Sequence, residues 1–233
     1  MDRQNRTSGE LINDIINYLQ YQKDLYGNDI YVPRKTRPKP SHKPRSKAQL
    51  LNALYLEVKD CQQCNLHKTR RNVVFGAGNP NADIMLIGEA PGADEDMQGK
   101  PFVGTAGQLL TKILAAIHLK REEVFITNIL KCRPPRNRDP LPEERDVCKN
   151  HLYQQIEIIK PKFILALGRI AGQVLLETDK TMQQLRGHIY DFRGAKLIVT
   201  YHPAALLRHQ EWKRATWEDV QKLEKLYLNE KDK

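Results

Sequence analysis

The chain has 233 residues, of which 40% are hydrophobic, enough for one α/β domain with a full core and an extension. No apolar run approaches the ~18 residues that a membrane span requires, and the polar N-terminus shows no secretory signal, so we expect a cytoplasmic protein with no membrane partner. The formal net charge of +10 favours a polyanionic partner, and nucleic acid is the first candidate.

The N-terminal extension combines a predicted helix with a basic linker. Residues 9–26 predict an amphipathic helix, whose apolar face comprises Leu11, Ile12, Ile15, Ile16 and Leu19. Residues 33–47 hold seven Lys or Arg, four Pro and no Asp or Glu, which predicts an extended linker. Either this linker lies along DNA phosphates or it is a solvated spacer, and the helix packs on the main domain or on a partner. We therefore predict an extension over residues 1–47 and one domain over residues 48–233.

Four cysteines are spaced as metal ligands rather than as disulfides. Cys61 and Cys64 form a CxxC pair, and the other two, Cys132 and Cys148, are separated by fifteen residues. In a reducing compartment this pattern favours a metal ion or a cluster. The residues alone do not separate a structural zinc from a [4Fe–4S] cluster, and four unrelated buried cysteines are a third interpretation.

Predicted strands and helices alternate along the rest of the chain. We predict strands at 81–88, 121–130, 162–168 and 195–203, and helices at 48–61, 109–119, 142–160, 169–177 and 213–228. Such alternation predicts a three-layer α/β/α fold with a central four-stranded parallel sheet, joined by right-handed crossovers.

Three motifs begin where predicted strands end. The stretches are 88–110, 127–140 and 201–208, and ligands of open α/β sheets bind at the carboxyl ends of the strands. The first is rich in glycine, which allows close approach of backbone amides to a ligand. Because it also contains two carboxylates, Glu89 and Glu95, and one aromatic residue, Phe102, it predicts a site for a flat polar ring.

Four stretches in this order resemble the motifs of the family 4 uracil-DNA glycosylases, the iron–sulfur type. They are CQQC at 61–64, GEAPGADEDMQGKPFVGTAGQLL at 88–110, TNILKCRPPRNRDP at 127–140 and YHPAALLR at 201–208, and the resemblance covers roughly residues 48–220. It implies a uracil-DNA glycosylase-like fold and a monomer that excises uracil from single- or double-stranded DNA. It also implies that a [4Fe–4S] cluster is held by the four cysteines, Cys61, Cys64, Cys132 and Cys148.

The resemblance assigns the base-binding roles. Asn128 can donate to uracil O4 and accept from N3–H, a pattern that cytosine does not match. Phe102 would stack on the flipped base, and its flanking Pro and Gly predict exposure in a loop. His202, at the end of a predicted strand, would stabilise the negative charge that develops at O2. Backbone groups around the ring would come from Gly88, Glu89 and Ala90.

The residue that positions the attacking water is open at this point. Family 1 enzymes carry an Asp at the position that is Ala90 here, so that general base is absent. The candidates are Glu89, Glu95 and Asn137, and the resemblance points first to Glu89 and Asn137. An Asn orients water or contacts phosphate rather than taking a proton. We also expect the motif's basic residues beside the DNA backbone: Lys131, Arg133, Arg136 and Arg138.

Two other functions are weighed against hydrolysis. One is a DNA-binding module with a structural cluster and no catalysis, recruited through the N-terminal helix. The other is a catalytically weak or covalently crosslinking relative that binds uracil-containing DNA. The first predicts a damaged base-binding site, and the second predicts an inserted His-bearing loop. The sequence shows neither feature.

Overall fold

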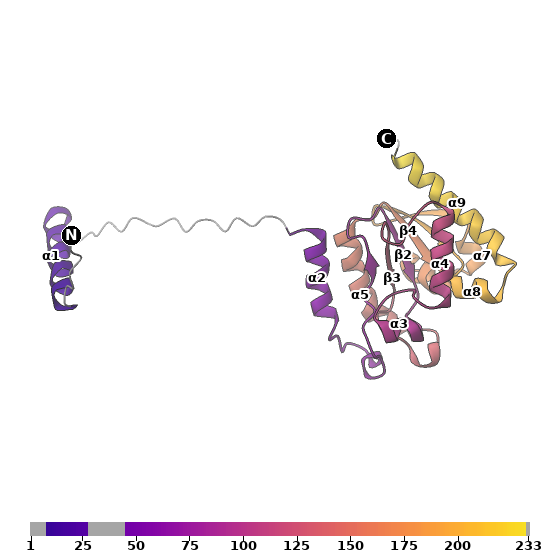
Figure 1. The fold of residues 1–233 in the computed structure, drawn as a ribbon, viewed down its shortest axis with the longest axis horizontal. Helices are drawn as coiled ribbons and strands as arrows, with labels where there is room; N and C mark the ends of the chain where they lie inside the picture. The colour runs from indigo at the N-terminus through magenta and orange to yellow at the C-terminus, as the bar shows by residue number, and fades with distance from the viewer. Residues whose placement is uncertain (1–7, 28–44, 232–233) are drawn as a thin grey trace, which may run out of the picture. The chain divides into compact units, whose positions relative to one another are not determined.

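The computed structural model describes residues 8–27 and 45–231, which belong to two units, Met1–Lys43 and Pro44–Lys233. The first unit contains helix α1, Ser8–Tyr26 (Figure 1). Its predicted apolar face is present and solvent-exposed, with the side chains of Leu11, Ile12, Ile15, Ile16 and Leu19 between 43% and 56% exposed. Most of the predicted linker lies outside the described residues.

The second unit alternates strands and helices. Its helices are α2 (Lys47–Val58), α3 (Ala93–Gln98), α4 (Thr105–Ala116), α5 (Pro142–Ile159), α6 (Arg169–Leu176), α7 (Met182–Leu185), α8 (Pro203–Arg208) and α9 (Trp212–Lys231), with two 3₁₀ turns at Asn65–Lys68 and Pro135–Asn137. Its strands are β1 (Ala77–Gly78), β2 (Ile84–Gly88), β3 (Phe125–Asn128), β4 (Phe163–Leu167), β5 (Ile189–Phe192) and β6 (Ala195–Thr200). Within the described residues, no helix is both long and apolar enough to cross a membrane.

The sheet has the order β1-β3-β2-β4-β6-β5. The four central strands are parallel, as predicted, while β1 and β5 are antiparallel edge strands that the sequence pattern did not indicate. Neither edge strand could be predicted from a run of apolar residues. β1 has only two residues, and β5 is partly exposed along its length, so neither presents a continuous buried run.

Two apolar layers enclose the sheet, and they explain why strands β2 and β4 are buried along their whole length. Met85 and Ile87 pack on one side with residues of α2, α5 and α6. Ile84 and Leu86, which alternate with them, pack on the other side with residues of α4 and α9. Figure 1 shows the strands between the α2–α5 pair and the α4–α9 pair. The three-layer α/β/α prediction is confirmed.

Local signals fix the helix starts. Ser46 caps α2 in a reciprocal capping box, in which Gln49 N donates to Ser46 Oγ and Ser46 N donates to Gln49 Oε1. Pro142 starts α5, and Leu141 N donates to Glu144 Oε2 at 2.9 Å. The strand expected to reach His202 ends earlier, at Thr200, and His202 instead caps α8. That prediction was wrong because Pro203 starts a helix directly after the strand.

Candidate active site

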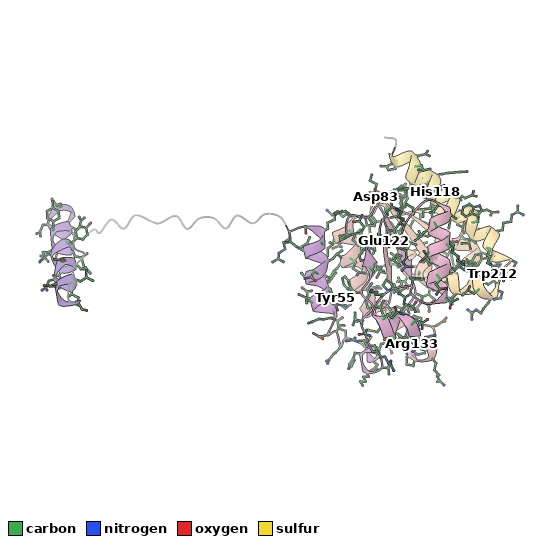
Figure 2. All side chains as sticks on the ribbon, viewed as in Figure 1. Tyr55, Asp83, His118, Glu122, Arg133 and Trp212 are labelled. Atoms are coloured by element: carbon green, nitrogen blue, oxygen red, sulfur yellow. The ribbon has the colours of Figure 1, made fainter. Side chains whose placement is uncertain are left out.

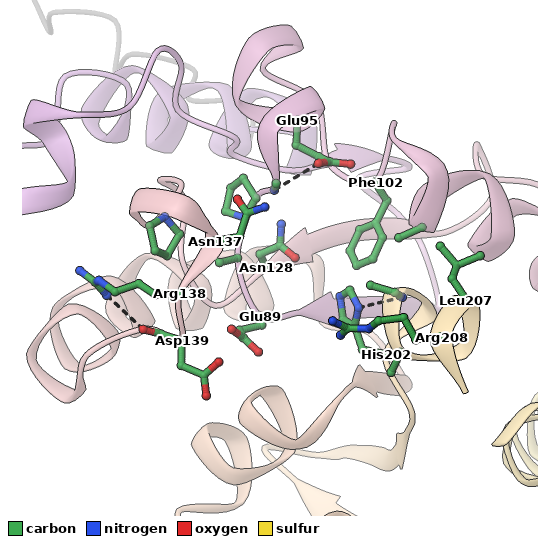
Figure 3. A pocket seen from close by; sticks show the side chains of 17 residues that line it. Glu89, Glu95, Phe102, Asn128, Asn137, Arg138, Asp139, His202, Leu207 and Arg208 are labelled. Atoms are coloured by element: carbon green, nitrogen blue, oxygen red, sulfur yellow. Dashed lines mark hydrogen bonds between the residues drawn. The ribbon is translucent and has the colours of Figure 1, made fainter. Parts of the chain in front are cut away.

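A pocket of about 570 Å³ opens at the carboxyl ends of the parallel strands (Figure 3). Seven of the eight predicted catalytic and base-binding residues line it: Glu89, Ala90, Glu95, Phe102, Asn128, Asn137 and His202. The eighth, Gly88, ends β2 beside them. A Cβ at Gly88 would overlap the side-chain oxygen of Asn128 and would lie 2.6 Å from Phe102 Cζ. The three motifs therefore form one site, and the glycine lets two of its side chains approach closely.

Asn128 ends β3 and pairs with Gly88 across the sheet. Its side chain is 1% exposed, and Oδ1 has no hydrogen-bond partner, the only such atom among the buried side chains of the described residues. Burying an amide oxygen without a partner costs roughly 1–3 kcal/mol. An acceptor left bare at the wall of a pocket is therefore suited to a ligand that brings an N–H group.

Phe102 forms an apolar wall of the pocket. It is only 5% exposed and packs in the apolar layer beneath α4, so the expected exposure in a loop was wrong. Its φ of 51° is unusual for a bulky residue, and the close approach of Gly107 to its carbonyl permits this turn. The ring centroid lies 5.5 Å from that of His202. A planar ligand entering the pocket meets a pre-positioned aromatic ring.

Glu95 holds the loop that carries Phe102. Its Oε1 accepts N–H bonds from Val103 and Gly104, both at 2.9 Å, and its Oε2 accepts one from Gly92 at 3.1 Å. Both carboxylate oxygens are thus occupied by the backbone. The carboxylate fixes the shape of the pocket wall, which leaves Glu89 as the better placed of the two glutamates to act on water.

His202 presents one ring N–H to the pocket. Its Nδ1 accepts the backbone N–H of Ala204 at 3.2 Å, so in the neutral ring the proton lies on Nε2. Burial lowers the pKa of His202 to about 4; the nearby Glu95 carboxylate opposes the shift and Arg208 adds to it. At neutral pH the imidazole is therefore an uncharged donor.

The Glu89 carboxylate lines the pocket (Figure 3). Burial, with a smaller contribution from the Asp139 carboxylate, raises the pKa of Glu89 from 4.5 to about 7. The guanidinium groups of Arg169 and Arg145 oppose this shift. A carboxylate poised near neutral pH can take a proton from water and can also be ionised when positive charge develops beside it.

Asn137 reaches the pocket from the 3₁₀ turn. Its Oδ1 accepts from Arg133 Nε at 2.7 Å, and its φ is 54°, a region that Asn tolerates. Because the oxygen is paired with Arg133, the NH₂ group is the half of the amide free to contact a ligand or water. The next residue, Arg138, forms two hydrogen bonds to Glu144, at 2.8 and 2.6 Å, and ties the turn to α5.

The four cysteines line a second, smaller cavity, here called the cysteine cavity, together with Val58, Val73 and Val147. Three sulfurs have nitrogen partners: Arg70 donates to Cys132 at 3.2 Å, Lys131 N donates to Cys148 at 3.3 Å, and His151 lies 3.5 Å from Cys61. No group of three His, Cys, Asp or Glu in the described part of the chain converges to hold one metal ion. The sulfurs thus surround a space without sharing a single coordination point.

Comparison with known proteins agrees with this geometry. Residues 75–221 match the family model of the uracil DNA glycosylase superfamily. The chain belongs to this superfamily. It is 45% identical to a type-4 uracil-DNA glycosylase of Archaeoglobus fulgidus over 184 residues, which are 76% of this chain and 92% of the relative. Type-4 uracil-DNA glycosylases of Pyrobaculum aerophilum (47%, 68% of this chain and 85% of the relative) and Thermotoga maritima (43%, 76% and 94%) are similar.

The position of Lys131 differs from the one predicted. It was expected beside the DNA backbone, but its side chain is 1% exposed. The ammonium group donates to Thr127 Oγ1 at 2.6 Å, Asn128 O at 2.8 Å and Gln155 Oε1 at 2.7 Å. A buried ammonium needs three such partners, and tertiary contacts from α5 supply one of them. Lys131 therefore links the strand end that carries Asn128 to the wall of the cysteine cavity.

Sequence reasoning also missed two groups near the pocket. Asp139 lines the pocket and contributes to the raised pKa of Glu89, yet it had no assigned role. Glu144 is 2% exposed and anchors Arg138, which was expected to contact DNA. The charge of Asp139, two residues after the motif residue Asn137, was a signal that could have drawn attention to it.

Proposed function

We propose that this protein binds uracil flipped out of DNA and hydrolyses its N-glycosidic bond, releasing uracil and leaving an abasic site. The observation that carries the proposal is the partnerless Oδ1 of Asn128 at the pocket wall. Uracil offers an N–H group at N3, whereas cytosine has an unprotonated nitrogen there. A buried acceptor that uracil satisfies and cytosine does not gives strong discrimination between these two bases.

Three side chains of the pocket would each contact one part of the uracil ring. The Asn128 NH₂ group donates to O4 while Oδ1 accepts from N3–H. Phe102 contributes the apolar surface on which the flipped base stacks. The His202 Nε2–H donates to O2, where negative charge develops as the base leaves. The imidazole is neutral at neutral pH, and it stabilises the anion by donating a hydrogen bond from Nε2–H.

Bond cleavage is dissociative. The C1′–N1 electron pair leaves with uracil as its anion, and the sugar becomes an oxocarbenium ion. The ionised Glu89 stabilises that positive charge, and it takes one proton from the water that adds to C1′. The uracil anion takes a proton from the solvent and is released, and Glu89 returns its proton to the solvent. Asn137 orients the water through its NH₂ group, and Glu95 acts through the loop rather than on the water.

The donor set of the cysteine cavity fits a [4Fe–4S] cluster held by Cys61, Cys64, Cys132 and Cys148. A zinc ion would require all four sulfurs within about 2.3 Å of one point, whereas each thiolate of a cluster binds a different iron. The N–H groups from Arg70 and Lys131 suit thiolate sulfurs. When bound, the cluster would cross-link three chain segments, namely the CxxC stretch, the loop after β3 and α5, and would take no step in base excision.

Release of uracil from oligonucleotides tests the function directly. A single-stranded oligonucleotide with one uracil should yield free uracil and an alkali-labile abasic site, and the matched cytosine oligonucleotide should yield neither. A duplex with the same strand measures the strand preference. Binding without cleavage would favour the DNA-binding alternative, and a heat-stable protein–DNA adduct would favour the crosslinking relative. We also propose that the protein acts as a monomer and that its N-terminal extension contacts DNA or a partner protein.

A further inference from the structure

Three aromatic rings are stacked where α8 ends and α9 begins. The Tyr201 and Trp212 ring centroids are 4.6 Å apart with an interplanar angle of 16°, and those of His209 and Trp212 are 4.2 Å apart at 20°. Figure 2 labels Trp212 at the start of α9. Uracil recognition in the pocket uses none of these rings, so the stack has no role in the chemistry described above.

A partly buried ion pair fixes the base of the stack. Arg186 lies over the Tyr201 ring, with its Cζ 5.6 Å from the centroid. The same guanidinium binds both carboxylate oxygens of Asp219, at 3.2 and 3.3 Å. Asp219 is 2% exposed and also accepts from the Thr200 hydroxyl at 2.9 Å. Because the rings are held in place before any ligand arrives, a further ring can join the stack at a low entropic cost.

The other end of the stack is open and lies next to the pocket lining. The His209 side chain is 46% exposed although its ring packs on Trp212. It directly follows Arg208, which lines the pocket. Arg208, Lys213 and Arg214 are exposed and basic. Two exposed carboxylates offset part of this charge, because Glu211 lies 3.3 Å from His209 and Glu218 pairs with Arg214. The remaining positive charge attracts DNA phosphates to this segment. An exposed ring continuous with a DNA-binding pocket is suited to a neighbouring base of the same strand.

We propose that the stack of His209, Trp212 and Tyr201 binds an unpaired nucleobase adjacent to the flipped uridine, with that base resting on His209. The inference rests on the proposed function for the place of the uridine, whereas stacking of a base on His209 does not itself require uracil. Every base has an aromatic face, so the subsite is indifferent to sequence. In a duplex the neighbouring base stays stacked within its own helix, so the subsite favours single-stranded DNA.

A double-mutant cycle between protein and DNA tests the contact. The protein variants are wild type and His209→Ala; the single-stranded substrates carry uracil with intact neighbours or with an abasic residue on its 5′ or 3′ side. His209→Ala should raise KM for the intact strand about tenfold with kcat nearly unchanged, and should affect the duplex less. An abasic residue on one side of the uracil should raise the KM of the wild type by about the same factor as His209→Ala does. The same abasic residue should not raise the KM of the His209→Ala variant further.

Fluorescence gives a readout that does not depend on excision. The chain has two Trp, so Trp217→Phe leaves Trp212 as the single reporter within the stack. A uracil-free single strand should change its emission, and His209→Ala should abolish that change. His209→Phe, which restores a ring, should retain tight binding. His188→Ala removes an exposed histidine that does not line the pocket and should behave as wild type.

Equal losses on single strands and duplexes, with the same abasic sensitivity in both proteins, would overturn the proposal and leave the stack as a brace for the α8–α9 corner. Unchanged Trp212 emission would do the same. Thermal unfolding of each variant shows whether the fold is intact. If wild type released no uracil at all, the proposed function would fail, while the fluorescence titration would still decide whether the stack binds a base.

Discussion

The pocket and the cysteine cavity share one segment of chain, yet their buried polar groups differ in hydrogen bonding. In the pocket, the side-chain oxygen Oδ1 of the buried Asn128 has no hydrogen-bond partner. Three residues along, at the cysteine cavity, Lys131 uses its ammonium group in three hydrogen bonds. Groups left unsatisfied at a cost are those that await a ligand, whereas fully paired groups hold the frame.

Removing a cysteine should have the largest effect, because it breaks the frame. We expect Cys132→Ser to lose visible absorbance, iron and sulfide together with soluble folded protein, since ligand binding and local folding share one free energy. Iron analysis and thermal unfolding measure this. Ser46→Gly, which removes only the cap of α2, serves as a mild control. A colourless, active protein with one zinc per chain would contradict the cluster.

Glu89→Gln should slow excision by roughly 10²–10⁴-fold, the usual contribution of a general base. In wild type, kcat/KM should rise with pH up to about 7 and then level off, as Glu89 ionises. The variant should lack this rise. Histidine should add no step near neutral pH, because the pKa of His202 is about 4. A pH profile of the variant parallel to that of wild type would remove Glu89 from the mechanism.

Glu89→Gln should slow excision but should stabilise the folded protein at high pH. The folded-state pKa of Glu89 lies above its unfolded value of 4.5, so its contribution to stability is complete below pH 4.5 and is lost as the pH rises through about 7. At pH 8 Glu89→Gln should therefore be more stable than wild type by up to about 3 kcal/mol. Chemical denaturation at pH 4 and pH 8 measures the difference.

Asn128→Asp should cost about a hundredfold in single-turnover excision of uracil, because the carboxylate can no longer donate to O4. The preference for uracil over cytosine should fall further than the rate alone implies. Asn81→Asp, at an exposed turn outside the pocket, is the matched control. Wild-type rates with Asn128→Asp would show that another group recognises the base edge.

Phe102→Ala should weaken binding about tenfold for both bases in parallel, because stacking does not distinguish base edges. Single-turnover rates on matched uracil and cytosine oligonucleotides separate the two variants. A change confined to selectivity would mean that Phe102 does more than stack. Thermal unfolding must accompany the assay, since Phe102 also packs in the apolar layer under α4.

Deleting residues 1–43 should have the smallest effect. The cut keeps Ser46, which caps α2, and removes five of the seven Lys and Arg of the predicted linker. Excision at low salt should be unchanged, because the pocket lies wholly in the second unit. If the linker contacts phosphates, the log–log salt slope of single-strand binding should become shallower by up to about 3.5. Identical slopes would make the linker a spacer.

The sequence by itself determined the alternation of four buried strands with helices and the position of three motifs at strand ends. These follow from local periodicity and from the fact that parallel strands end at one edge of a sheet. It did not predict the burial of Phe102 or of Lys131, because part of the environment of each comes from a segment distant in the chain. His202 lies beside Phe102, and Gln155 of α5 binds Lys131.

Tertiary structure alone decided which polar groups remain free. Asn128 and Asn137 have the same side chain, yet Oδ1 is bare in the first and bonded to Arg133 in the second. Likewise Glu95 is occupied by three backbone amides while Glu89 is desolvated beside Asp139. A residue type fixes which hydrogen bonds and charges are available, whereas burial and long-range partners fix which of them are left for a substrate.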